Sequence, residues 1–160
     1  MLKKIEEHFE EALLVLLMGS MSVLIFVQIV MRYVFQASLS WSEELARYLF
    51  VWLSYIGVAC AVKKGAHIRV DAFTSLLSAR LQQQVLIVAE CAFLFFALMV
   101  VKEGFALSLK IFGFGQFSPA LGIPMGFIYL APVVGFTLVV LRLLQVIVQA
   151  VKDLKEGRSQ

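Results

Sequence analysis

The chain has 160 residues and a mass of 17.9 kDa, and 61% of its residues are hydrophobic whereas only 16% are charged. A water-soluble domain of this size could not bury so much apolar surface, because small folds have a high ratio of surface to volume. The net charge of +3 comes from 14 basic and 11 acidic residues spread between apolar blocks, which excludes a disordered tail, a disulfide scaffold and a nucleic-acid-binding module. The composition therefore predicts a single all-α integral membrane domain, residues 1–160.

Four apolar blocks are long enough to cross a bilayer as helices, since about 20 residues at roughly 1.5 Å each match a hydrocarbon core of about 30 Å. We expect the spans near residues 12–34, 41–62, 81–103 and 119–141. The first block is expected to be a retained anchor and not a signal peptide. The residues before it are acidic as well as basic, and no small-residue cleavage pattern follows it.

The start of the second span carries charged and aromatic residues. Glu43 completes a capping box of the S-x-x-E form, and it stands four residues before Arg47 in the order that favours an ion pair. Trp41 and Trp52 are typical of an aromatic belt and a helix packing face. The pair of glutamates Glu43 and Glu44, close to Trp41, could instead mark a docking site on the outer surface.

Lysine and arginine are distributed unevenly between the connections. Ten of them lie in the N-terminal segment, the loop after the second span and the C-terminal tail, against four in the other two connections. This distribution predicts that both termini face the cytoplasm. In the cytoplasmic loop, residues 71–80 are expected to form a short interfacial helix, and His67 and Asp71 to order the loop. The tail, 142–160, is expected to continue the fourth helix with one apolar side.

Glu90 is the acidic residue that lies well inside a predicted span, where burying a charge costs about 2.5 to 3.5 kcal/mol or more. It stands within one or two turns of the cytoplasmic start of the third span. A structural role near lipid headgroups or a lysine is therefore favoured, and proton or ion coupling stays open as the alternative.

The sequence offers no pattern typical of an enzyme or of a metal site. Cys60 and Cys91 have no spacing that suggests a metal and are expected to pack as small residues. No pair of histidines lies on the spans to hold a haem, and neither a catalytic triad nor a glycine-rich phosphate loop is evident. We expect no catalytic residue, no metal and no cofactor in this chain.

Prolines mark the approach to the fourth span. Ser118 is expected to cap this helix with Pro119 at its first position, and Pro124 is either the true helix start or a bend. Pro132 is expected to kink the helix, because it cannot donate a hydrogen bond to the carbonyl of Ile128. Such breaks can open the backbone for a ligand or only shape a packing surface, and we favour the second interpretation.

Several short motifs occur in a fixed order along the chain. They are Arg32-Tyr33, Trp41-Ser42-Glu43-Glu44-Leu45-Ala46-Arg47-Tyr48 followed by Phe50-Val51-Trp52, Gly57, His67-Ile68-Arg69-Val70-Asp71 and Ser118-Pro119-Ala120-Leu121-Gly122-Ile123-Pro124. With these motifs the chain resembles the small membrane subunit of tripartite ATP-independent periplasmic (TRAP) transporters, the DctQ family. The resemblance lies in the order of the motifs and in their positions relative to the spans, and it covers nearly the whole chain. Gln28 is a small departure, since the family commonly has asparagine there.

The resemblance implies a location in a bacterial inner membrane and a role in a permease complex. In such complexes a large membrane subunit binds the substrate and the sodium ions, and a periplasmic binding protein delivers an organic acid. Sialic acids, C4-dicarboxylates and sugar acids are the candidate substrates. The small subunit is regarded as part of the fixed scaffold for the elevator-like movement of the large subunit.

Roles for individual residues follow from these expectations as hypotheses. Glu43 and Arg47 would fix the outer end of the second span and contact the large subunit. Arg32 would hold phospholipid phosphates or a carboxylate of the partner. Trp41 and Glu44 would belong to the surface seen by the binding protein, and Trp52 is a further candidate for the partner interface.

A self-sufficient four-span exporter of the small multidrug type is the alternative function. It would couple export to protons through Glu90 and act as a homodimer. Such exporters are shorter and carry the essential carboxylate in the first span, and the stretch from Ala12 to Met31 contains none. Drug efflux that disappears in Glu90→Gln would support this alternative.

Overall fold

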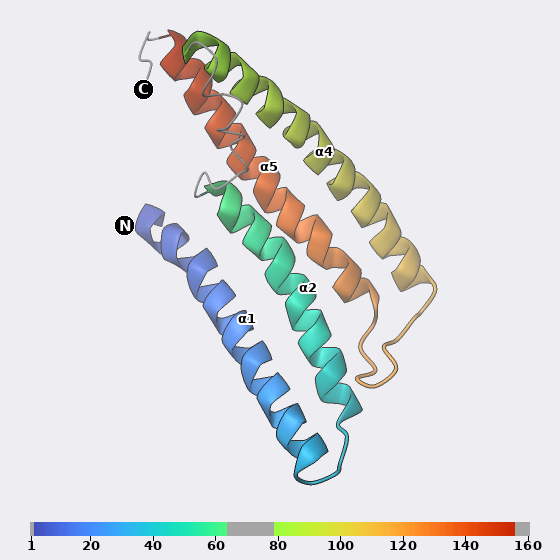
Figure 1. Cartoon of the computed structure of the whole chain (residues 1–160). Coiled ribbons are helices and arrows are strands. Elements are labelled where there is room, and N and C mark those ends of the chain that lie inside the picture. Colours follow the sequence, from blue (N-terminus) through green and yellow to red (C-terminus); the bar gives the residue numbers. More distant parts are fainter. Residues whose placement is uncertain (1, 64–78, 156–160) are drawn as a thin grey trace.

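The computed structural model describes residues 2–63 and 79–155, and within them the chain forms four helices. They are α1 (Leu2–Tyr33), α2 (Ser40–Lys63), α4 (Ala79–Gly113) and α5 (Gly126–Lys155) (Figure 1). Each has a stretch long and apolar enough to cross a membrane, namely Glu11–Tyr33, Ser40–Val62, Ile87–Gly113 and Gly126–Val148. The prediction of an all-α protein with four membrane-spanning helices is confirmed.

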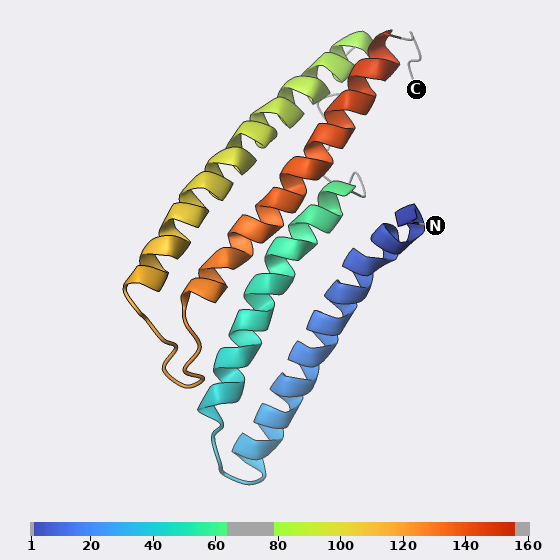
Figure 2. The ribbon, with the colours of Figure 1, turned by 180° about the vertical axis from the view of Figure 1, so that it is seen from behind.

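The helices lie side by side in the order α1, α2, α5, α4 (Figures 1 and 2). α5 packs against both α2 and α4, and α1 packs against α2. The connections 34–39 and 114–125 lie at one end of the bundle, which we call the loop end, and α1 starts and α5 finishes toward the opposite end. The assignment of that opposite end to the cytoplasm stays a prediction.

The core lies between α2, α4 and α5 and consists of small and branched aliphatic residues. Its buried members are Ala59, Val62, Ala97, Val139 and Leu143. Small residues let helix backbones approach closely, which matters in lipid because burial there gives no hydrophobic gain. Backbone meets backbone closely at Gly135 of α5, where an added Cβ would lie 2.7 Å from the Cβ and the carbonyl oxygen of Tyr55 in α2.

α1 stands at the edge of this arrangement. None of the residues in its most apolar stretch is buried by the rest of the chain. Its contact with α2 is loose at Gly57, where an added Cβ would have the Leu14 side chain as its nearest neighbour, at 3.9 Å. Lipid or another protein must therefore cover most of α1.

The end of the third helix differs from the prediction. α4 continues to Gly113, beyond the span end expected near residue 103. Lys102 and Glu103, at the expected end of the span, lie exposed on the helix surface and form an ion pair with 3.7 Å between Nζ and Oε1. A helix can continue through charges that pair on its surface.

The start of the fourth helix also differs. α5 begins at Gly126, so the expected helix start at Ser118 and Pro119 is wrong, and both residues belong to the α4–α5 loop. α5 continues beyond the membrane-spanning stretch to Lys155, as expected for the tail. The expected interfacial helix, 71–80, lies outside the described residues except for its last two, which begin α4.

Candidate functional site

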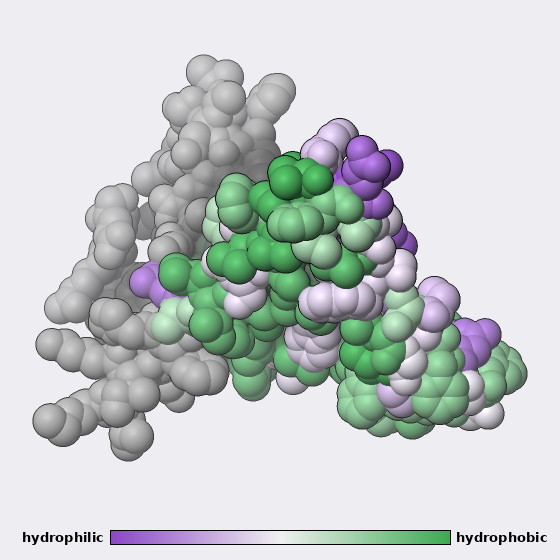
Figure 3. Space-filling model, turned by 90° about the horizontal axis from the view of Figure 1, so that it is seen from below, coloured by the Kyte–Doolittle hydropathy of each residue, from purple (hydrophilic) through white to green (hydrophobic). Residues whose placement is uncertain are grey.

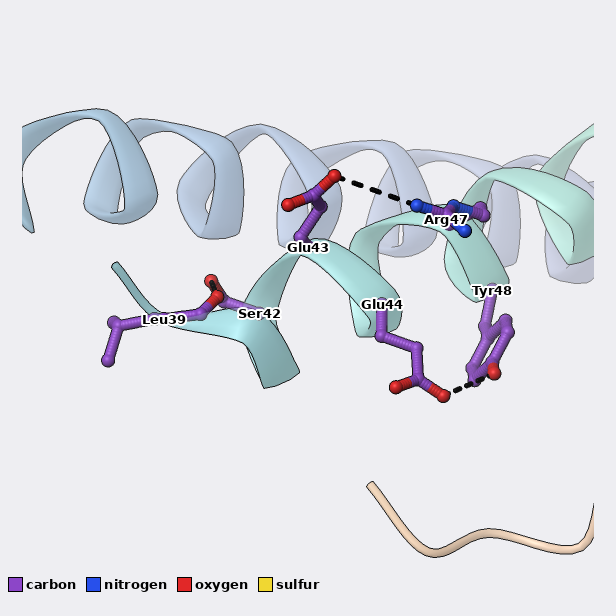
Figure 4. Close-up of polar contacts among 6 residues, drawn as sticks. All are labelled: Leu39, Ser42, Glu43, Glu44, Arg47 and Tyr48. Atoms are coloured by element: carbon purple, nitrogen blue, oxygen red, sulfur yellow. Dashed lines mark hydrogen bonds and ion pairs between the residues drawn. The ribbon is translucent and has the colours of Figure 1, made fainter. Parts of the chain in front are cut away.

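The start of α2 holds two neighbouring glutamates whose side chains point in different directions (Figure 4). Glu43 lies on the surface, where its Oε1 is 3.6 Å from Nη2 of Arg47 and both side chains are more than half exposed. The ion pair expected from the spacing is therefore present. Exposed pairs of this kind contribute at most about 1 kcal/mol, so it adds little to the stability of the chain itself.

Glu44, by contrast, is only 7% exposed and is enclosed by hydrogen-bond donors. Its Oε1 accepts a hydrogen bond from the hydroxyl of Tyr48, and its Oε2 accepts one from the backbone N–H of Ala120 at 2.7 Å. The hydroxyl of Ser118 and the backbone N–H of Leu121 also face this carboxylate. The expectation that Glu44 belongs to a surface seen by a binding protein is wrong, because the side chain points inward to the α4–α5 loop.

The α4–α5 loop that receives Glu44 is closed by hydrogen bonds of its own. The backbone N–H of Ser118 donates to the carbonyl of Ile123 at 2.8 Å, and the Ser118 hydroxyl accepts from the N–H of Ile123 at 3.2 Å. The N–H of Met125 donates to the carbonyl of Gln116 at 2.9 Å. Gly122 has a φ of +64°, which favours glycine and lets the chain turn back. Ser118 therefore closes the loop and does not cap a helix.

The two other prolines of the prediction lie at and inside α5. Pro124 stands two residues before the helix, and its carbonyl accepts a hydrogen bond from the N–H of Phe127 at 3.2 Å. Pro124 was expected to be either the helix start or a bend. Its position just before α5 is nearer to a helix start. Pro132 lies inside α5, and the kink at this residue stays a prediction.

A second polar contact joins α4 to the beginning of α5. The hydroxyl of Ser108, which is 1% exposed, donates to the carbonyl of Gly126 at 3.0 Å. An added Cβ at Gly126 would lie 2.5 Å from the ring of Phe112, so only glycine fits there without movement. Sequence reasoning missed this pair. The sequence features that could have indicated it are a serine within an apolar stretch and a glycine where a span begins.

The remaining candidate residues do not join this site. Arg32 lies exposed in the last turn of α1, and Trp41 is 43% exposed at the start of α2. Trp52 is half-buried further along α2, and Glu90 is half-buried in α4, which places it in a different part of the chain. His67 and Asp71, expected to order the cytoplasmic loop, lie outside the described residues.

The described residues offer little for binding a small ligand. They bring together no group of three or more His, Cys, Asp or Glu side chains that could hold a metal ion. A hollow of about 550 Å³ is open to the surroundings on α1 and is lined by apolar and small residues, namely Val15, Leu16, Gly19, Ser20 and Val23. Seen from the loop end, hydrophobic residues cover most of the described surface, with hydrophilic residues in small patches (Figure 3). Among the described residues, the site at the loop end is a junction at which hydrogen bonds join α2 to the α4–α5 loop.

Comparisons with known proteins agree with this description. Residues 21–153 match the family model described as tripartite ATP-independent periplasmic transporters, DctQ component. A putative TRAP transporter small permease protein of Haemophilus influenzae is 33% identical over 160 residues, which cover 98% of this chain and 94% of the relative. The isethionate TRAP transporter permease protein DctMQ of Oleidesulfovibrio alaskensis is 34% identical over 88% of this chain, but the match spans only 23% of that longer protein.

A third relative has a name that gives a different substrate. The sialic acid TRAP transporter small permease protein SiaQ of Vibrio cholerae is 33% identical over 59% of this chain and 54% of its own length. The family match covers most of this chain, and the four apolar helices agree with it. The chain therefore belongs to the DctQ family of TRAP transporter small permease subunits and is a multi-pass protein of the bacterial inner membrane.

Proposed function

We propose that this chain is the scaffold subunit of a TRAP transporter, which binds and stabilises a large membrane subunit during uptake of an organic acid. The observation that carries this proposal is that the Oleidesulfovibrio permease is much longer than the part of it that matches this chain. Most of this chain matches 23% of a single protein named as a permease. A region like this chain therefore occurs in one polypeptide with a much longer permease region, which is the arrangement expected of two parts that work together.

The polar groups of the described spans support a scaffold and not a transport pathway. Several hydroxyls donate to carbonyls one turn earlier in their own helix, as in the pairs Ser22 with Met18, Ser54 with Phe50, and Thr137 with Val133. Hydroxyls bonded in this way have satisfied their donors within the helix. We therefore propose that the large subunit holds the substrate site and the sodium sites.

The exposed apolar surface of α1 supports a large partner within the membrane. Val15, Phe26 and Ile29 are each at least half exposed, and the hollow beside Gly19 and Ser20 would let another helix approach closely. Contact with the large subunit is proposed for part of this surface, and phospholipid for the rest.

The substrate is proposed to be an organic acid that a periplasmic binding protein delivers. The relatives are named for isethionate, for C4-dicarboxylates and for sialic acid, which are all organic acids. Uptake would be driven by an ion gradient through the large subunit. Because this chain has no substrate pocket among its described residues, the binding protein and the large subunit would determine which acid is carried.

Purification of the tagged chain from its native membrane in mild detergent, with mass spectrometry of what co-elutes, tests the proposal. A stoichiometric, much larger polytopic subunit is expected. Reconstitution of that pair with the binding protein in liposomes should give uptake that requires both membrane subunits. Recovery of the chain only as a homo-oligomer, in a preparation that keeps other membrane complexes intact, would contradict the scaffold function and favour the exporter that uses Glu90.

A further inference from the structure

We propose that the turn at residues 118–121 of the α4–α5 loop is an anion-binding nest, and that the carboxylate of Glu44 occupies this nest and thereby positions the loop on α2. Glu44 is thus a positioning residue for the loop end of the bundle. This inference is independent of the transport function proposed above, because it rests on contacts within the chain.

The donors of the nest come from consecutive positions of one turn. The backbone N–H of Ala120 donates to Oε2 of the carboxylate at 2.7 Å, and the backbone N–H of Leu121 and the hydroxyl of Ser118 face the same carboxylate. Successive backbone N–H groups in a turn form a concave site that favours an anion. The turn is held in shape by the loop's own bond from the N–H of Gly122 to the carbonyl of Ser118, at 3.1 Å.

A carboxylate fits this set of donors better than any other side chain. It only accepts hydrogen bonds and offers two oxygens, and here Oε2 accepts from Ala120 while Oε1 accepts from Tyr48. An amide at the same position would present one oxygen and one NH2 donor, so part of the set would lose its acceptor. Glu44 is 7% exposed, and water therefore has little access to replace it.

The same carboxylate connects three parts of the fold. Glu44 and Tyr48 lie one turn apart on α2, and the hydroxyl of Tyr48 also lies 3.5 Å from Sδ of Met125, directly before α5. The loop, α2 and the start of α5 are thus joined at a single point. Because the loop is also closed by its own hydrogen bonds between Ser118 and Ile123, it is expected to shift as a unit when the carboxylate is removed.

The experiment replaces the carboxylate and then supplies it from solution. Glu44→Ala removes Cγ, Cδ and both oxygens, which are the heavy atoms of an acetate ion. Hydrogen–deuterium exchange is measured by mass spectrometry on the full chain in lipid nanodiscs. Exchange in the segment 116–123 is expected to rise about tenfold or more, as for the loss of a hydrogen bond to a charged group. Added sodium acetate should restore slow exchange, whereas sodium chloride at the same concentration should not.

The neighbouring glutamate provides a matched control. Glu43→Ala removes the same atoms one residue earlier, where the carboxylate is exposed and paired with Arg47, and should leave loop exchange unchanged with or without acetate. Exchange near Val139, in the core of α5, reports whether each variant is folded. Glu44→Asp keeps the charge but withdraws it from the nest by one methylene group, and should accelerate loop exchange several-fold if Glu44→Ala does not fold.

Three results would overturn the proposal. They are native-like loop exchange in Glu44→Ala or in Glu44→Asp, equal restoration by chloride and acetate, and equal acceleration in Glu43→Ala. A merely structural contribution of the Glu44 side chain would not give restoration by a small carboxylate.

Discussion

α1 and α5 are both long apolar helices, yet they have opposite positions in the molecule. α5 lies between α2 and α4, and Ala131, Val139 and Leu143 on it are fully buried. α1 contacts α2, and no residue of its most apolar stretch is buried by the chain. Hydrophobicity alone therefore identifies a helix that enters the membrane, but it does not determine which other helices pack against it. Shape decides that, since lipid and aliphatic side chains are equally apolar.

The largest expected effect comes from placing a side chain in the close contact between α2 and α5. Gly135→Leu would place a side chain against the backbone of Tyr55, which already lies 2.7 Å from an added Cβ. The backbones of α2 and α5 would have to separate, and we expect a loss of about 3 kcal/mol or failure to fold. Thermal denaturation of the detergent-solubilised chain measures the effect.

Gly19→Leu is the matched change on α1, because nothing lies within 4 Å of an added Cβ there. We expect the stability of the isolated chain to stay within about 0.5 kcal/mol of the native value. Equal destabilisation by both substitutions would contradict the distinction between α1 and α5. If the large subunit packs on the hollow beside Gly19, the same variant should lower recovery of the complex.

A smaller effect is expected from a cavity in the core. Leu143→Ala removes a side chain that is fully buried between the helices, and should cost about 2 kcal/mol through lost packing. Leu16→Ala removes the same atoms from α1, where the leucine is 66% exposed, and should change stability by less than about 0.5 kcal/mol. Unfolding in mixed micelles with increasing denaturing detergent compares the two. Similar losses in both variants would show that α1 is more tightly packed than the structure indicates.

The smallest effect on the chain itself is expected at the exposed ion pair. Glu43→Gln or Arg47→Ala breaks a pair of which both members are more than half exposed, and should cost at most about 0.5 kcal/mol of the stability of the chain. If the pair contacts the large subunit, recovery of the complex and substrate uptake should nevertheless fall. Unchanged recovery and unchanged uptake in both variants would exclude the pair from assembly.

The sequence was sufficient for those features that depend on neighbouring residues or on length. Four apolar blocks predicted four helices, and the spacing of Glu43 and Arg47 predicted their ion pair, because residues four apart meet on one face of a helix. The motifs from Trp41 onward also indicated the family that the comparisons establish.

Predictions were wrong where distant segments meet. Pro119 follows a serine and has the pattern of a helix start, but the loop closes on itself through Ser118 and Ile123 before α5 begins. Glu44 has nearly the same neighbours in the sequence as Glu43, but its carboxylate meets the N–H of Ala120, which is 76 residues away in the chain. No periodicity in the chain reports a contact over that distance.

The sequence by itself thus determined the four membrane-spanning helices of the described residues and the family, because a bilayer imposes length and apolar composition on each span separately. Only the tertiary structure decided that α5 is central and α1 peripheral, and that one of two adjacent glutamates is buried. Those outcomes depend on which backbones can approach closely and on which donors surround a carboxylate. Both are properties of segments that are far apart in the chain and meet only in the fold.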